Sequence, residues 1–149
     1  MSAGPGSDDL PKNALAVVGL VGRFPGARDV DELWENLCAG REGVHFFKPE
    51  ELDRSIPFSV RSDPAYVAAR GIIEDYDKFD ASFFDVTPIE AAVMDPQQRI
   101  MLELAWAALE SAGHPPATFA GLIGVYVGMN WNRYRANCVS AHPEVVARF

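Results

Sequence analysis

The sequence is poor in cysteine and in basic residues. Two cysteines in 149 residues cannot build a disulfide framework, and Asp8 and Asp9 stand where a secretory signal would carry positive charge. We therefore expect a protein of the reducing cytoplasm. With 13 Lys and Arg against 21 Asp and Glu the net charge is −8, which provides no basis for nonspecific binding to nucleic acids or anionic lipids.

A long uninterrupted hydrophobic run is also absent. Residues 111–132 contain no charged side chain, but Pro115, Pro116 and several glycines interrupt them, so we expect no membrane span. The composition, 48% hydrophobic and 23% charged, is ordinary for a globular protein and excludes disordered, collagen-like and disulfide-scaffold classes. A compact domain of this length buries about 70% of its unfolded surface.

Two short apolar runs predict buried strands. Residues 1–13 are rich in Gly, Pro, Ser and Asp and predict a disordered tail. Residues 14–21 then read ALAVVGLV, and residues 121–128 read GLIGVYVG. Continuous apolar runs of this length are typical of strands covered on both faces. Because helices are predicted between them, we expect the two strands to be parallel and joined by a right-handed crossover.

Helix signals follow the first predicted strand. Asp29 is a candidate N-cap, Glu32 the second half of a capping box, and Gly40 a C-terminal stop. Between them an apolar stripe is expected to face inward and three polar residues to face water. The stripe comprises Val30, Leu33, Trp34, Leu37 and Cys38, and the polar residues are Asp31, Glu35 and Asn36.

Two more helix starts combine a cap, a proline and a box partner. They are Thr87-Pro88-Ile89-Glu90 and Asp95-Pro96-Gln97-Gln98, and the second helix is expected to run to about Ala112, before Gly113. Its only polar stripe contains Arg99, Glu103 and Glu110. A helix this apolar needs cover from several layers or from a subunit interface. The order of strands and helices predicts a layered α/β protein.

The middle of the chain has weaker patterns. Residues 41–70 predict a long excursion with at most a short helical turn. Residues 71–80 are acidic, but Asp80 stands where a calcium-binding EF-hand needs Gly, and Val86 where it needs Glu. We expect a solvated acidic face around Ile72, Ile73 and Phe79.

The reactive residues predict no catalytic, cofactor-binding or metal site. Cys38 lies on an apolar stripe, and Cys138 faces His142 only if a helix continues toward Pro143. His45 and His114 show no metal-ligand spacing with the cysteines. The turn from Gly19 to Gly22 lacks both the dinucleotide and the P-loop motif, so close backbone packing is the favoured interpretation.

Several motifs occur in an order that resembles the N-terminal part of a β-ketoacyl synthase. They are residues 17–26 (VVGLVGRFPG), 31–37 (DELWENL), 79–84 (FDASFF), 87–91 (TPIEA), 94–99 (MDPQQR), 102–106 (LELAW) and 124–128 (GVYVG). The ketosynthase domains of modular type I polyketide synthases and multidomain fatty-acid synthases are the most similar. The 94–99 motif preceded by the 79–84 motif is highly specific.

The resemblance implies that residues 14–149 are an incomplete ketosynthase domain with part of a thiolase-like fold, layered α-β-α-β-α. It implies an acyltransferase that works as a homodimer and receives acyl groups from the phosphopantetheine of an acyl carrier protein, without a cofactor of its own. The parent would catalyse decarboxylative Claisen condensation of an acyl thioester with a malonyl-type extender. The family's nucleophilic cysteine lies in a Thr-Ala-Cys-Ser-Ser-like motif, and its histidines lie later. This sequence contains neither, so we expect the chain alone to be inactive.

Two groups of residues can be carried over. Asp95, Pro96, Gln97, Gln98 and Arg99 are expected to start and anchor the long helix. Asn130, Trp131 and Tyr134 follow the second predicted strand and are candidates for the acyl pocket or the dimer contact. Two alternatives stay open. One is a non-catalytic interaction module that binds a carrier protein or partner synthase, and the other is a nucleotide-binding domain using the Gly19–Gly22 turn.

Overall fold

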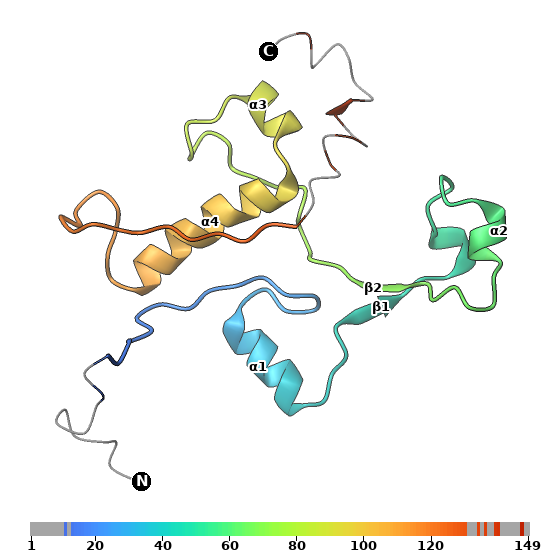
Figure 1. Cartoon of the computed structure of the whole chain (residues 1–149), viewed down its shortest axis with the longest axis horizontal. Helices are drawn as coiled ribbons and strands as arrows, with labels where there is room; N and C mark the ends of the chain where they lie inside the picture. The colour runs from blue at the N-terminus through green and yellow to red at the C-terminus, as the bar shows by residue number, and fades with distance from the viewer. Residues whose placement is uncertain are drawn as a thin grey trace.

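The fold is described on a computed structural model, in which residues 11, 13–130, 134, 136, 139, 140 and 147 are placed. The elements in chain order are α1 (Val30–Cys38), β1 (Val44–Phe46), η2 (Pro49–Glu51), α2 (Phe58–Arg61), β2 (Ala69–Gly71), α3 (Pro88–Val93) and α4 (Pro96–Ser111) (Figure 1). No helix in this described part is long and apolar enough to cross a membrane. The tail predicted over residues 1–13 lies almost wholly outside the described residues.

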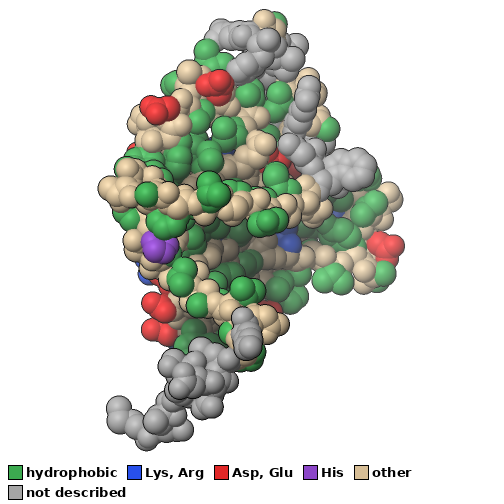
Figure 2. Space-filling model, turned by 60° about the vertical axis from the view of Figure 1, so that its left-hand side comes forward, with side chains coloured by type: hydrophobic (Ala, Val, Ile, Leu, Met, Phe, Trp, Pro, Cys, Tyr) green, Lys and Arg blue, Asp and Glu red, His purple; other side chains and the backbone are tan. Residues whose placement is uncertain are grey.

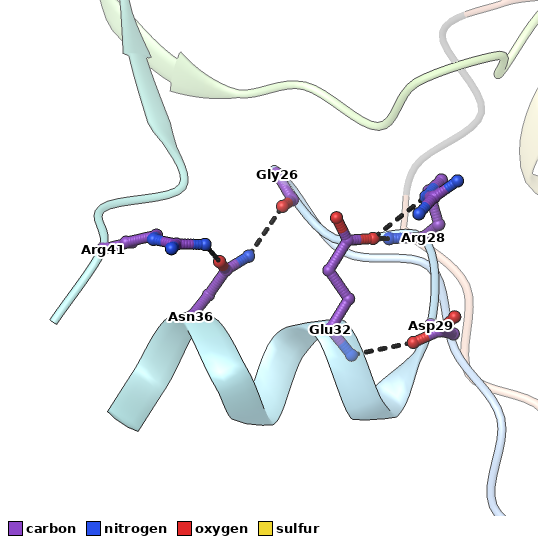
Figure 3. A network of polar contacts seen from close by, with 6 residues as sticks. All are labelled: Gly26, Arg28, Asp29, Glu32, Asn36 and Arg41. Atoms are coloured by element: carbon purple, nitrogen blue, oxygen red, sulfur yellow. Dashed lines mark hydrogen bonds and ion pairs between the residues drawn. The ribbon is translucent and has the colours of Figure 1, made fainter. Parts of the chain in front are cut away.

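The ends of α1 confirm the predicted start and stop. Asp29 Oδ1 accepts a hydrogen bond of 2.8 Å from the backbone N–H of Glu32, and Gly40 takes a φ of 63° after the C-cap. The predicted capping box is displaced by one residue. The Glu32 carboxylate accepts from the backbone N–H and the Nε–H of Arg28, at 2.8 and 3.1 Å, because this neighbour offers two donors, one of them charged (Figure 3).

The face that α1 presents inward differs from the prediction. Val30 and Leu33 are half-buried, but Trp34 and Leu37 are 66% and 61% exposed. Cys38 is also exposed. Apolar side chains become buried only where other structure covers them, and within the described residues the cover reaches only one side of the stripe.

Asn36, which was predicted to face water, is half-buried and joins two loops. Its Nδ2 donates 2.7 Å to the carbonyl of Gly26, and its Oδ1 accepts 3.1 Å from Arg41 Nη1 (Figure 3). The amide carries both a donor and an acceptor, and it therefore ties the chain before α1 to the chain after it.

A tight turn at residues 24–27 packs on the small sheet. Phe24 and Ala27 exchange backbone hydrogen bonds of 2.9 and 3.0 Å, and Gly26 adopts a φ of 74° that suits glycine in such a turn. A Cβ on Gly71 would lie 2.6 Å from Pro25 Cγ. Ala27, at 6% exposed, is the one buried hydrophobic residue among those described.

Residues 41–70 hold more structure than the single helical turn predicted for them. β1 and β2 form a two-stranded antiparallel sheet with Val44 opposite Gly71 and Phe46 opposite Ala69, and η2 and α2 lie between them. Strands of three residues carry too little alternation for a sequence pattern to show. The next segment, 71–80, agrees with the prediction, since Ile72, Ile73 and Phe79 are half-buried and the acidic residues are exposed.

The caps of α3 and α4 are largely as predicted. Thr87 and Glu90 form the reciprocal capping box of α3. At α4 the Asp95 side chain accepts a hydrogen bond of 2.8 Å from the backbone N–H of Gln97. The side chain that lies next to the Asp95 carboxylate is that of Gln97, not that of the predicted partner Gln98. The helix ends at Ser111, and Gly113 takes a φ of 70°.

The polar stripe of α4 is turned toward protein rather than toward water. Arg99 is 9% exposed, the Glu103 side chain is 22% exposed, and only Glu110 is open to solvent. Arg99 and Glu103 are each held by a polar partner from another segment, which offsets the cost of their burial. Most apolar residues of α4 are half-buried rather than buried.

The two predicted strands are extended but unpaired. Gly19 lies against Ala108 and Ala112, and Arg23 against Glu103, so the first segment runs antiparallel to α4. Segment 121–130 leaves the end of α4 and returns to its first turn, so both segments run in the same direction, as predicted (Figure 1). Within the described residues neither has backbone hydrogen bonds to a neighbouring strand. A strand requires such a ladder, and the predicted parallel, layered sheet is therefore not formed here.

Apolar surface stays open as a consequence. Leu15, Val17, Leu122 and Tyr126 are between 83% and 103% exposed. The chain exposes 12336 Å², whereas a compact protein of 16.3 kDa exposes about 7,500 Å². Figure 2 shows hydrophobic side chains spread across one such face among few charged ones.

Candidate functional site

The junction between α3 and α4 is the centre of the candidate site. α3 ends at Val93, Met94 is extended with a ψ of 130°, and Pro96 occupies the first turn of α4. Proline disfavours helical geometry in the residue before it, and its missing N–H is not needed at a helix start. The chain therefore makes a sharp, defined bend at residues 94–95.

Asp95 is 4% exposed, which is unusual for a carboxylate. Its Oδ1 accepts 2.8 Å from the backbone N–H of Gln97, and Gln97 Nε2 lies 3.4 Å away. Gln97 and Gln98 themselves are exposed. Asp95 is thus the N-cap of α4.

Arg99 connects the first part of α4 to the acidic segment. Its Nη1 donates 3.2 Å to the backbone carbonyl of Asp77, while its Nε has no hydrogen-bond partner among the described residues. The 79–84 motif packs on the same helix, where the rings of Phe83 and Trp106 meet edge to face at 4.8 Å. Phe83 and Phe79 both contact Phe84. The sequence carried no signal for the Asp77 contact.

Two of the three candidate pocket residues come to this junction. The backbone N–H of Asn130 donates 3.3 Å to Gln97 Oε1, at the start of α4. The Tyr134 hydroxyl donates 3.0 Å to the carbonyl of Ala92, near the end of α3. Trp131 lies outside the described residues. The structure thus brings together two groups that the sequence analysis named separately.

Electrostatics at the junction favours an ionised carboxylate on α3. The hydroxyl and backbone N–H of Thr87 both bond to Glu90, at 2.7 and 3.0 Å, and lower the pKa of its carboxyl below the usual 4.5. An open hollow of about 420 Å³ lies beside this helix, lined by Asp85, Val86, Glu90, Val93, Met94 and Gln98.

A second open groove of about 610 Å³ lies between residues 17–23 and α4. Glu103, Leu104 and Ala107 contribute the helix side, and Arg23 stands at its end. Its other sides are the extended segment, whose apolar side chains are exposed, and residues 28–31 at the start of α1. We interpret this groove as an incomplete packing face of the domain rather than as a ligand site.

Cys38, His45 and His114, the cysteine and histidines among the described residues, lie in separate parts of the chain. Cys38 is the last residue of α1. The helix dipole favours a thiolate at the N-terminus of a helix, whereas Cys38 lies at the C-terminus. Cys138 and His142 lie outside the described residues. His45 stands 4.0 Å from Glu51, and His114 packs on Phe119. No group of three metal-ligating side chains converges anywhere in residues 13–130.

Sequence comparison identifies the family of this arrangement. The family model described as "Beta-ketoacyl synthase, N-terminal domain" matches residues 12–148. A phenolphthiocerol/phthiocerol polyketide synthase polypeptide of Mycobacterium tuberculosis is 48% identical over 136 residues, which are 91% of this chain and 9% of that protein. Polyketide synthase ThaG of Burkholderia thailandensis is 39% identical over 127 residues, 83% of this chain and 2% of that protein.

Structure comparison agrees. The crystal structure of ketosynthase twelve from the bacillaene polyketide synthase of Bacillus amyloliquefaciens matches with a TM-score of 0.57 and 42% identity. The match covers 64% of this chain and 17% of that one. The chain therefore spans a small part of the length of the relatives it matches.

Proposed function

The chain belongs to the β-ketoacyl synthase family, whose N-terminal domain it matches, and we propose that it is the amino-terminal part of a polyketide synthase ketosynthase. The match over residues 12–148 carries the proposal. The described geometry supports it, since Phe83 of the 79–84 motif packs on Trp106 of α4, and Arg99 of the 94–99 motif bonds to Asp77, just before the 79–84 motif.

The parent reaction follows from the family. An enzyme thiolate takes the acyl group from a carrier thioester and releases the carrier thiol. The malonyl-type extender loses CO₂, and its carbanion attacks the enzyme-bound acyl carbonyl. The enzyme thiolate leaves, and a 3-oxoacyl thioester stays on the carrier. Residues 1–149 contain no Thr-Ala-Cys-Ser motif, so the reacting thiol is not contributed by this part.

This part would have a structural role, because it supplies some of the protein that surrounds the reacting centre of the complete domain. The exposed apolar segments 14–21 and 121–128 would become strands of a layered, thiolase-like sheet once partners flank them. The homodimer and the acyl carrier protein would belong to the complete domain. Asn130 and Tyr134 would then contribute to its acyl pocket or dimer contact.

Covalent labelling tests this assignment. We expect no acyl adduct on Cys38 or Cys138 after incubation of the chain with a short acyl thioester, measured by intact mass and peptide mapping. A stoichiometric adduct on either cysteine would refute the inactive-part assignment. Reading the coding frame past residue 149 separates the alternatives. A continuation that encodes Thr-Ala-Cys-Ser supports the enzyme, whereas an immediate stop supports an interaction module that binds a carrier protein or partner synthase.

A further inference from the structure

We propose that Gln97 is a positioning residue, which holds the chain after segment 121–128 against the α3–α4 junction. That this segment borders an acyl pocket rests on the proposed function, whereas the contact between Gln97 and the segment does not. The sequence pattern favours Gln98, at the third helical position, as the partner of Asp95, and both glutamine side chains are exposed. Their contacts distinguish them.

The Gln97 side chain makes use of both ends of its amide. Nε2 lies 3.4 Å from Oδ1 of Asp95, and Oε1 accepts 3.3 Å from the backbone N–H of Asn130. Asp95 is 4% exposed and is itself held by the backbone N–H of Gln97 at 2.8 Å. An acceptor-only carboxylate at Asp95 orients the amide so that its NH₂ points inward and its oxygen points to Asn130.

A second bond restrains the same chain segment from the other helix. The Tyr134 hydroxyl donates 3.0 Å to the carbonyl of Ala92 on α3. Asn130 is therefore tied to α4 and Tyr134 to α3, on the two sides of the bend at residues 94–95. Because Pro96 makes that bend well defined, the two tethers place Asn130 and Tyr134 relative to it.

Substitutions of Gln97 would affect its contact with Asp95 and its contact with Asn130 differently. Methionine has a similar length but neither a donor nor a strong acceptor. Glutamate keeps an acceptor for Asn130 but places a second carboxylate beside Asp95. A side chain that served only Asp95 would leave amide exchange at Asn130 unchanged in both variants. A positioning role predicts that Gln97→Met loses the Asn130 contact and that Gln97→Glu keeps it.

Amide hydrogen exchange of the 149-residue chain, resolved at Asn130, tests the tether. We expect Gln97→Met to speed exchange at Asn130 roughly fivefold, the effect of losing one net hydrogen bond. The matched control Gln98→Met should leave it unchanged, and Gln97→Glu should restore slow exchange at Asn130. Fast exchange at Asn130 in the unaltered chain, or equal effects of Gln97→Met and Gln98→Met, would overturn the proposal.

The second tether supplies an independent measurement. Tyr134→Phe removes only the hydroxyl, and we expect the double variant with Gln97→Met to speed exchange at Asn130 by more than the two single effects combined. Purely additive behaviour of the two variants, as for separate sites, would count against a shared segment. None of these readouts involves acyl chemistry, so a failure of the tether and a failure of the ketosynthase assignment are distinguishable.

Discussion

Arg23 and Glu103 form an ion pair in which Arg23 Nη2 lies 2.7 Å from Glu103 Oε2. Their side chains are 30% and 22% exposed, and Glu103 Oε2 is buried without a hydrogen bond of good geometry among the described residues. The pair joins the chain after segment 14–21 to the middle of α4. It explains how a charged residue is accommodated on the covered side of an otherwise apolar helix.

Breaking this pair from one side should destabilise the chain. Arg23→Met leaves the Glu103 carboxylate without its cation, and we expect the free energy of unfolding to fall by about 1–2 kcal/mol, between the values for exposed and buried pairs. Urea denaturation followed by tryptophan fluorescence measures it. The double variant Arg23→Met/Glu103→Leu should recover most of the loss. The exposed pair of Arg28 and Glu32 provides the control, and a loss in Arg28→Met as large as in Arg23→Met would contradict the interpretation.

Gly19 should tolerate no side chain. A Cβ at this position would lie 2.7 Å from the carbonyl oxygen of Ala108, at the close approach between the extended segment and α4. We expect Gly19→Ala to move the segment away from the helix and to cost about 1–3 kcal/mol, as overpacking does. Gly128→Ala is the matched control, because a Cβ there meets nothing within 4 Å. Equal stability of the two variants would show that the segment does not pack as described.

Acid should weaken the start of α3. Thr87 lowers the pKa of the Glu90 carboxyl below its ordinary 4.5, so the folded state favours the ionised form. A lowered folded-state pKa contributes stability above pH 4.5, and this contribution is lost as the pH falls through the folded-state value. We expect the helical circular dichroism signal to decrease as the pH is lowered below 4.5. Glu90→Gln should flatten this part of the titration, and an unchanged acid limb in that variant would exclude the capping box as its source.

The exposed apolar segments should bind a hydrophobic dye. Leu122 is 103% exposed and Ala27 is 6% exposed. We therefore expect Leu122→Asp to reduce dye fluorescence with little change in helical content, and Ala27→Asp to reduce helical content strongly, because it buries an unpaired charge. If the unaltered chain melts sharply as a monomer and binds no dye, these segments are covered and the described exposure is wrong.

Local signals predicted the helices well because each depends on residues close in sequence. Asp29 and Gly40 delimit α1, and the capping box of Thr87 and Glu90 starts α3. The proline at the start of α4 follows the same logic. A cap bonds to a backbone group within four residues, so the pattern alone contains the information.

Patterns that depend on distant partners were predicted poorly. The β1–β2 sheet joins Val44 to Gly71, and no local alternation announces it. The inward orientation of Arg99 and Glu103 was also missed, because hydropathy alone predicts that charged residues face water. Their partners, Asp77 and Arg23, lie far away in sequence.

The sequence by itself determined where α1 and α4 begin and end, where α3 begins, which segments are apolar enough to become strands, and to which family the chain belongs. Only the tertiary structure decided that Gln97 rather than Gln98 reaches Asn130, and that segments 14–21 and 121–128 run along α4 without a ladder. The physical reason is the range of the forces involved. A cap or an apolar run is set by neighbours in the chain, whereas a tether or a sheet is set by which groups the folded backbone brings within hydrogen-bond distance.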